Sequence, residues 1–134
     1  TECNGRKLRG PNDIVFDAHG GMWFTDYGIR QERTADFTGI YYAKIDGSYI
    51  KEMAFPILSA NGVGLSPDEK TVYVADTYSA RLLAFDITAP GVLAPDAGLG
   101  GAGRSANGVA SAGVSGASCR STRFASSALG SAVS

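Results

Sequence analysis

Two asparagines at equivalent places in a repeated pattern are the residues of this sequence whose type and spacing could do chemistry. Asn12 and Asn61 each come just before a short apolar segment, and they are 49 positions apart. A carboxamide can donate and accept hydrogen bonds, and its oxygen is a hard ligand that suits cations such as calcium. Asparagine is also common in turns, so the pattern taken alone fits a turn residue as well as a ligand.

Both asparagines belong to a repeat that organises residues 1–88. Residues 11–27 read PNDIVFDAHGGMWFTDY, and residues 60–77 read ANGVGLSPDEKTVYVADT. Each copy has an apolar stretch, a polar turn and a second apolar stretch that ends in aspartate, Asp26 in the first copy and Asp76 in the second. A period of about 40 to 50 residues made only of short strands and turns is typical of a β-propeller blade.

The repeat predicts an all-β fold with two four-stranded antiparallel blades. In the first blade we expect strands at residues 13–17, 22–26, 39–45 and 48–54. In the second blade we expect strands that start at Gly62 and continue through residues 71–75 and 81–86. A fourth strand for this blade would have to come from the C-terminal residues, whose sequence does not look like a strand.

The composition changes sharply after the second copy of the repeat. Every aromatic residue except Phe124 lies in residues 1–88, whereas Ala, Gly and Ser dominate residues 89–134. Such a segment cannot bury enough apolar surface to offset the entropy of ordering its backbone. We therefore expect a partial propeller region over residues 1–93 and a disordered low-complexity tail over residues 94–134.

Charge, hydropathy and cysteine content exclude several classes of function. The chain has 12 basic and 13 acidic residues, which gives no electrostatic reason to bind nucleic acid or an anionic membrane. No apolar run approaches the ~20 residues of a membrane-spanning helix. Cys3 and Cys119 form no metal-type cluster, and we expect both to be free thiols. The sequence begins at Thr1 without a signal segment, so we expect an incomplete N-terminus, either from processing or because the chain is a fragment. The sequence does not show the compartment, and of the alternatives a cytoplasmic location is favoured.

The two copies resemble the family of senescence marker protein 30, gluconolactonases and luciferin-regenerating enzymes. The resemblance is carried by PNDIVFD at 11–17, GGMWFTD at 20–26, NGVGLSPD at 61–68 and TVYVAD at 71–76. It implies a six-bladed propeller, of which two blades would be present here. The NGVGLSPD stretch favours this family over propellers of the strictosidine-synthase-like or NHL type.

The resemblance also implies an activity and a set of site residues. The family's activity is hydrolysis of sugar lactones such as gluconolactone, with a divalent cation, calcium or zinc, in the central channel. Asn61 matches the family's metal-binding asparagine, and Asn12 matches one that contacts substrate in some members and metal in others. Asp13 is a further metal-ligand candidate. Arg9 lies one position from a substrate-binding arginine of the family.

Two carboxylates of the family pattern have no counterpart in this sequence. The metal-binding glutamate is expected before residue 1, and the aspartate that serves as ligand and catalytic base is expected in a later blade. We therefore predict no lactonase turnover by this chain alone, and the alternative function is a non-catalytic propeller fragment or interaction module. We expect Asp26 and Asp76 to bind turn backbone, and His19 to lie in a surface turn.

Overall fold

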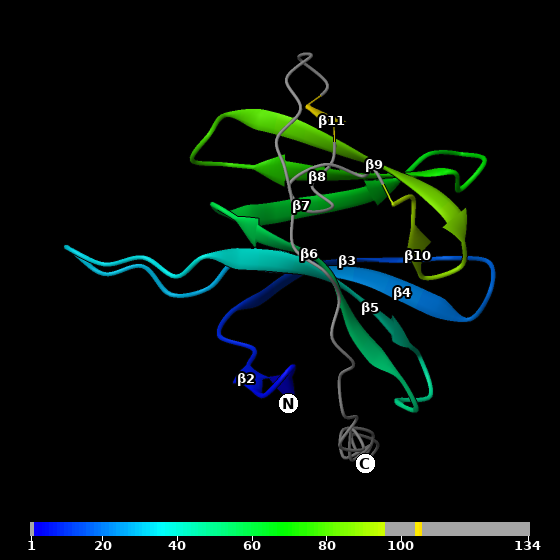
Figure 1. The fold of residues 1–134 in the computed structure, drawn as a ribbon, viewed down its shortest axis with the longest axis horizontal. Helices are drawn as coiled ribbons and strands as arrows, with labels where there is room; N and C mark the ends of the chain where they lie inside the picture. Colours follow the sequence, from blue (N-terminus) through cyan, green and yellow to red (C-terminus); the bar gives the residue numbers. More distant parts are fainter. Residues whose placement is uncertain (1, 96–103, 106–134) are drawn as a thin grey trace, which may run out of the picture.

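Short apolar segments between polar, glycine-containing turns give this chain strands rather than helices. In the computed structural model, which describes residues 2–95 and 104–105, all the regular structure is β-strand (Figure 1). The strands are β1 (Glu2–Cys3), β2 (Arg6–Lys7), β3 (Pro11–Phe16), β4 (Gly21–Asp26), β5 (Thr38–Lys44), β6 (Ile50–Ile57), β7 (Ala60–Leu65), β8 (Thr71–Asp76), β9 (Arg81–Ala89), β10 (Val92–Leu93) and β11 (Arg104–Ser105). The predicted all-β class is confirmed.

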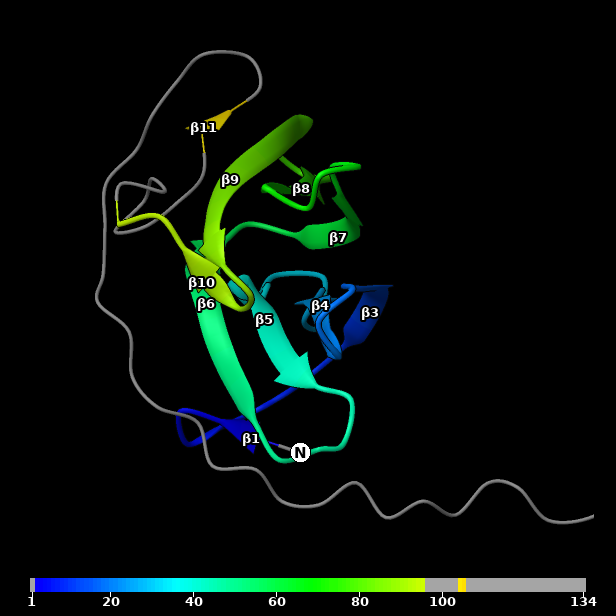
Figure 2. The same ribbon diagram turned by 90° about the vertical axis from the view of Figure 1, so that its right-hand side faces the viewer.

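The strands form two antiparallel meanders that lie against each other. The first sheet has the order β3-β4-β5-β6, and the second has the order β7-β8-β9-β10, with β11 also paired to β9. Figure 2 shows one sheet above the other, with β3 and β7 on the same side. These two strands contact each other across the gap between the sheets. The sheet edges that carry the two asparagines are therefore neighbours.

The second sheet has a fourth strand, although the sequence after residue 88 did not look like a strand. Val92 and Leu93 form the short strand β10, which pairs with β9 immediately after a turn at Gly91. Gly91 adopts a φ of 69°, a left-handed conformation that glycine adopts without steric cost. The remaining part of the predicted tail, residues 96–103 and 106–134, lies outside the described residues.

The main hydrophobic core lies between the two sheets. Trp23 and Tyr42 of the first sheet pack edge to face, with ring centroids 5.0 Å apart. The second sheet covers them with side chains that include Val74 and Phe85, both fully buried. The burial of these large apolar side chains is the main force that holds the sheets together.

A second, smaller core covers the other face of the first sheet. Phe24 and Tyr41 stack there with ring centroids 5.1 Å apart, and Cys3 of the β1–β2 hairpin packs against the same cluster. Cys3 is buried and disulfide-bonded, so the expectation of a free thiol at this position was wrong. Cys119 lies outside the described residues. Within the described part of the chain, the structure has no helix long and apolar enough to cross a bilayer.

Candidate functional site

Each asparagine lies at an irregularity near the start of an edge strand. In the first sheet Pro11 pairs with Asp26, but the ladder resumes with an extra residue on β3, at Asn12–Asp13. The second sheet repeats this shift on β7, at Asn61–Gly62. Such β-bulges bend a strand and re-aim its side chains. The same local device therefore directs both asparagines.

A buried aspartate holds the chain just before each asparagine. The Asp26 carboxylate accepts hydrogen bonds from the backbone N–H groups of Arg9 and Gly10, at 2.9 and 2.6 Å. Asp76 accepts from the backbone N–H and the hydroxyl of Ser59, at 3.0 and 2.8 Å. Each aspartate thus satisfies donors two residues before an asparagine, which fixes where the bulge begins. The expectation that both aspartates bind turn backbone is confirmed.

The two asparagine side chains meet at the edge where β3 and β7 are neighbours. Nδ2 of Asn12 donates a hydrogen bond to Oδ1 of Asn61 at 2.5 Å. Nδ2 of Asn61 in turn donates to Oγ1 of Thr77 at 2.9 Å. Asn12 is exposed and Asn61 is half-buried, so the pair can be reached from solvent. The structure brings together the two residues on which the predicted site depends.

Thr25 is a positioning residue that the sequence did not reveal. Its hydroxyl is fully buried, accepts a hydrogen bond from the Asp13 backbone N–H at 3.2 Å and donates one to the Asn61 carbonyl oxygen at 2.5 Å. It therefore connects the two bulges directly. The second copy of the repeat has alanine at the equivalent position, Ala75, so comparison of the copies gave no signal for this contact. Thr77 was missed for the same reason, because the first copy has Tyr27 there.

Asp13 links the two sheets through its carboxylate. One oxygen accepts a hydrogen bond from the backbone N–H of Ile14, and the other accepts from that of Val63, both at 2.9 Å. The contact with Val63 joins β3 to β7 beside the asparagine pair. A negative charge therefore lies at the pair, although both of its oxygens already accept hydrogen bonds. A role for Asp13 as a metal ligand stays a prediction.

Arg9, the remaining site candidate, and His19, the predicted turn residue, each lie beside an acidic side chain rather than contacting the asparagine pair. The Arg9 side chain points to Asp36, with Nε 3.8 Å from the Asp36 carboxylate, in a cavity of about 740 Å³ that Phe37 also lines. A substrate-binding role for Arg9 stays a prediction. His19 is exposed in the turn after β3, with Nε2 3.9 Å from the Glu69 carboxylate, which confirms a surface turn. This turn lies at the end of β3 opposite to Asn12.

The asparagine pair has oxygens of a kind that suits calcium, but too few of them. Calcium takes six to eight oxygen ligands, commonly with several carboxylates. Among the residues that the structure describes, no three Asp, Glu, His or Cys side chains gather closely enough to hold a metal ion. The described residues therefore do not by themselves complete a calcium site.

The chain is similar in sequence to one protein family and to several named proteins. Residues 1–99 match the family described as SMP-30/Gluconolactonase/LRE-like region. The chain is 41% identical over 81 residues to a protein named lactonase drp35 from Staphylococcus saprophyticus, an alignment that covers 60% of this chain and 24% of that protein. Proteins of the same name from Staphylococcus epidermidis and Staphylococcus aureus are 39% identical over 71 residues, which is 53% of this chain and 21% of each of them.

These alignments cover only a small part of each relative. The chain spans about a quarter of the length of the curated relatives that it matches. The family match, in contrast, covers most of this chain and includes both bulges and both asparagines. This chain belongs to the SMP-30/gluconolactonase/LRE-like family.

Proposed function

We propose that this chain is part of a lactone hydrolase and that Asn12 and Asn61 belong to its binding centre. The observation that carries the proposal is the hydrogen bond between these two side chains, which come from equivalent bulges of neighbouring sheets. Family membership and relatives named lactonase support the class of reaction. The convergence of the two amides supports the location of the site.

The two sheets are proposed to be consecutive blades of a six-bladed propeller, in the region of residues 1–93. Trp23 and Ile40 of the first sheet are buried against the second sheet. By strand register, Tyr73 and Leu82 take the equivalent places on the second sheet, where they are 36% and 44% exposed. The second sheet therefore offers an apolar face of the kind that a further blade would cover. Residues 94–134 are proposed to be a low-complexity segment outside the repeat, of which Arg104–Ser105 pairs with β9.

The substrate is proposed to be a small sugar lactone, such as gluconolactone. The exposed carboxamide of Asn12 has donor and acceptor groups that suit the hydroxyls and the carbonyl of such a ring. The hydrogen bonds of Asn61 to Asn12 and Thr77 fix the orientation of both amides before a ligand arrives. Preorganised polar groups of this kind lower the cost of binding.

A divalent cation, calcium or else zinc, is the proposed cofactor. Asn61 and Asn12 would each contribute an amide oxygen, and Asp13 is a further candidate ligand. When bound, such an ion polarises a lactone carbonyl and lowers the pKa of a coordinated water. The carboxylates that calcium prefers would have to come from outside the described residues. The catalytic base is likewise proposed to lie outside them.

The shortage of carboxylate ligands supports a second reading for the chain taken alone. A non-catalytic propeller module would keep the asparagine pair and its hydrogen bonds but lack turnover. We expect no hydrolysis of gluconolactone by the isolated chain above the uncatalysed rate, with or without added calcium. A pH-stat assay before and after EDTA treatment tests this expectation, and calcium-dependent acid release by the isolated chain would contradict it.

A hybrid enzyme tests the proposed function. In this hybrid lactonase, the residues of this chain that align with the Staphylococcus saprophyticus lactonase drp35 replace the matching 81-residue segment of that protein. We expect the hybrid lactonase to hydrolyse a lactone that the parent hydrolyses. We expect Asn61→Ala to lower its kcat/KM about tenfold or more, the usual range for groups that orient a metal or substrate.

A matched variant separates function from folding. Gln31→Ala removes a carboxamide of similar size from the exposed loop after β4, and we expect it to leave kcat/KM unchanged. Circular dichroism and thermal unfolding of each variant check the fold. A folded hybrid lactonase that keeps full activity with Asn61→Ala would overturn the proposed role of the pair.

A further inference from the structure

Two tyrosines and an arginine gather at one end of the sheets, and the proposed function has not used them. The Tyr27 and Tyr78 hydroxyls are hydrogen-bonded at 3.1 Å, and their ring centroids are 6.1 Å apart. The guanidinium carbon of Arg30 lies 3.8 Å from the centroid of the Tyr78 ring. Tyr78 and Arg30 are exposed. We call Tyr27, Arg30 and Tyr78 the rim cluster.

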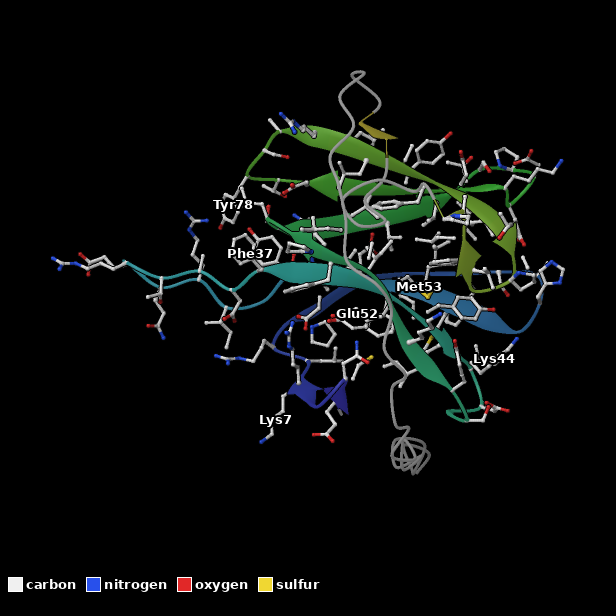
Figure 3. The ribbon with its side chains drawn as sticks, viewed as in Figure 1. Lys7, Phe37, Lys44, Glu52, Met53 and Tyr78 are labelled. Atoms are coloured by element: carbon white, nitrogen blue, oxygen red, sulfur yellow. The ribbon has the colours of Figure 1, made fainter. Side chains whose placement is uncertain are left out.

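The rim cluster lies next to the asparagine pair. The Tyr27 backbone N–H donates to the carbonyl oxygen of Gly10 at 2.7 Å, two residues before Asn12. Tyr78 directly follows Thr77, the residue whose hydroxyl accepts the hydrogen bond of Asn61. Tyr27 is thus connected through a backbone hydrogen bond to the segment that leads to Asn12, and Tyr78 is connected through Thr77 to Asn61. Figure 3 shows Tyr78 and Phe37 at the end of the sheets from which the 27–37 loop extends, with Lys44 at the opposite end.

The loop that carries Arg30 is held in a defined shape. Arg30 and Ala35 form an antiparallel bridge, and the Gln31 N–H donates to the Thr34 carbonyl oxygen at 2.8 Å. At the base of the loop, the Ile29 N–H donates to the Asp36 carboxylate at 2.9 Å. The loop is therefore a small hairpin that keeps the Arg30 backbone beside the tyrosines. Functional loops of this kind often shape substrate choice.

The charge of Arg30 is not neutralised within the described part of the chain. No Asp or Glu of these residues forms an ion pair with it, whereas the nearby Arg9 lies beside Asp36. A guanidinium that lies over an aromatic ring can still offer N–H groups to a carboxylate, and its planar fork matches a carboxylate with two hydrogen bonds. The hydrogen bond between the two tyrosines raises the pKa of Tyr27 and lowers that of Tyr78, as expected for Tyr27 as donor and Tyr78 as acceptor.

We propose that the rim cluster holds the end of a lactone that is remote from its reacting carbonyl, and that Arg30 favours lactones with a carboxylate at that end. This inference rests on the proposed function of the asparagine pair. The tyrosine rings offer apolar faces with polar tips, which suits the mixed surface of a sugar-derived ring. The guanidinium supplies the charge that distinguishes an acidic substituent from a neutral one.

A binding experiment with the full chain tests this proposal. The probes are D-glucaro-1,4-lactone, which has a carboxylate at carbon 6, and D-glucono-1,4-lactone, which has a hydroxymethyl group there. Binding is followed at mildly acidic pH by NMR of isotope-labelled tyrosine rings. We expect the carboxylate lactone to bind about fivefold more tightly, since an exposed ion pair is rarely worth more. We expect this preference to weaken as salt is added.

Arg33 provides a matched control for Arg30. It is an exposed arginine near the tip of the same loop, and among the residues that the structure describes no ion pair or ring contact involves it. We expect Arg30→Met to remove the preference for the carboxylate lactone, so that the two lactones bind equally. Arg33→Met, which makes the same change in net charge, should keep the preference.

The possible results separate the two proposals. Equal binding of the two lactones by the natural chain, or binding of neither, would overturn the rim cluster as a carboxylate-selective subsite. Equal effects of Arg30→Met and Arg33→Met would also overturn it, because they would indicate only a general charge effect. None of these results bears on hydrolysis by the hybrid lactonase, which tests the proposed function by itself.

Discussion

The side chains of Asn12 and Asn61 are joined by a hydrogen bond of 2.5 Å across two separate sheets. Each side chain leaves its strand at a bulge of the same register, two residues after a segment that a buried aspartate holds. The pair is therefore the meeting point of two copies of one structural device. Its geometry depends on the aspartates, the bulges and the packing between the sheets, and each of these can be tested.

The carboxylate of Asp76 should contribute to stability through the buried Ser59. Asp76→Ala leaves the N–H and hydroxyl of Ser59 without their acceptor, in a place where Ser59 is fully buried. We expect a loss of about 1–3 kcal/mol in the free energy of unfolding, the usual cost of an unsatisfied buried group. Urea unfolding followed by the fluorescence of Trp23 measures it. Glu32→Ala, at an exposed position, should change stability little. Similar losses for both variants would mean that the hydrogen bonds from Ser59 to Asp76 do not stabilise the fold.

Gly21 should be intolerant of any side chain. A Cβ atom there would lie 1.8 Å from the Tyr42 hydroxyl oxygen, and Tyr42 is buried in the main core. We expect Gly21→Ala to cost about 1–3 kcal/mol, as overpacking commonly does. Gly64→Ala is the control, because no heavy atom lies within 4 Å of a Cβ built at Gly64. Thermal unfolding of both variants compares them, and equal melting temperatures would show that Tyr42 is not packed as described.

Asp17 should make stability depend on pH in the acidic range. Partial burial raises the pKa of its carboxyl, but hydrogen bonds from the Tyr42 hydroxyl and from the Gly21 and His19 N–H groups outweigh this, so the net pKa is lowered from 3.8. A carboxyl with a lowered folded-state pKa stabilises the fold above its unfolded pKa, and this contribution is lost as the pH falls through the folded pKa.

The Asp17→Asn variant isolates that contribution. We expect it to be less stable than the natural chain by about 1 kcal/mol at neutral pH, since the amide cannot replace all three hydrogen bonds. The difference should stay constant from neutral pH down to about pH 4 and shrink below that. Urea unfolding at a series of pH values measures it. A difference that grows as the pH falls would mean that the carboxylate is not stabilised in the folded state.

Strand positions and the meeting of the asparagines could be predicted from the sequence because both follow from local patterns. Apolar stretches between turns locate strands such as β4 and β8, and two copies of one pattern in adjacent sheets place Asn12 and Asn61 at equivalent edges. Thr25 could not be predicted, because its hydroxyl contacts Asn61 only after the sheets have packed. The short strand β10 was missed because pairing with β9, rather than its own composition, makes it a strand.

The rim cluster illustrates the same limit. Tyr27 and Tyr78 are 51 residues apart and do not align in the repeat, so nothing in the sequence pairs them. Tyr27 is the first residue after β4, whereas Tyr78 is the second residue after β8. The two side chains meet because the two sheets pack against each other. Residues that act across sheets are visible only once the register between the sheets is known.

A double-mutant cycle in the hybrid lactonase tests the central claim most directly. Asn12→Ala, Asn61→Ala and the double variant are compared by kcat/KM for lactone hydrolysis. If the two amides form one binding centre, each single change should cost about tenfold or more, and the double change should cost clearly less than the product of the two. Losses that multiply, or single variants of full activity, would show that the two asparagines do not act as one site.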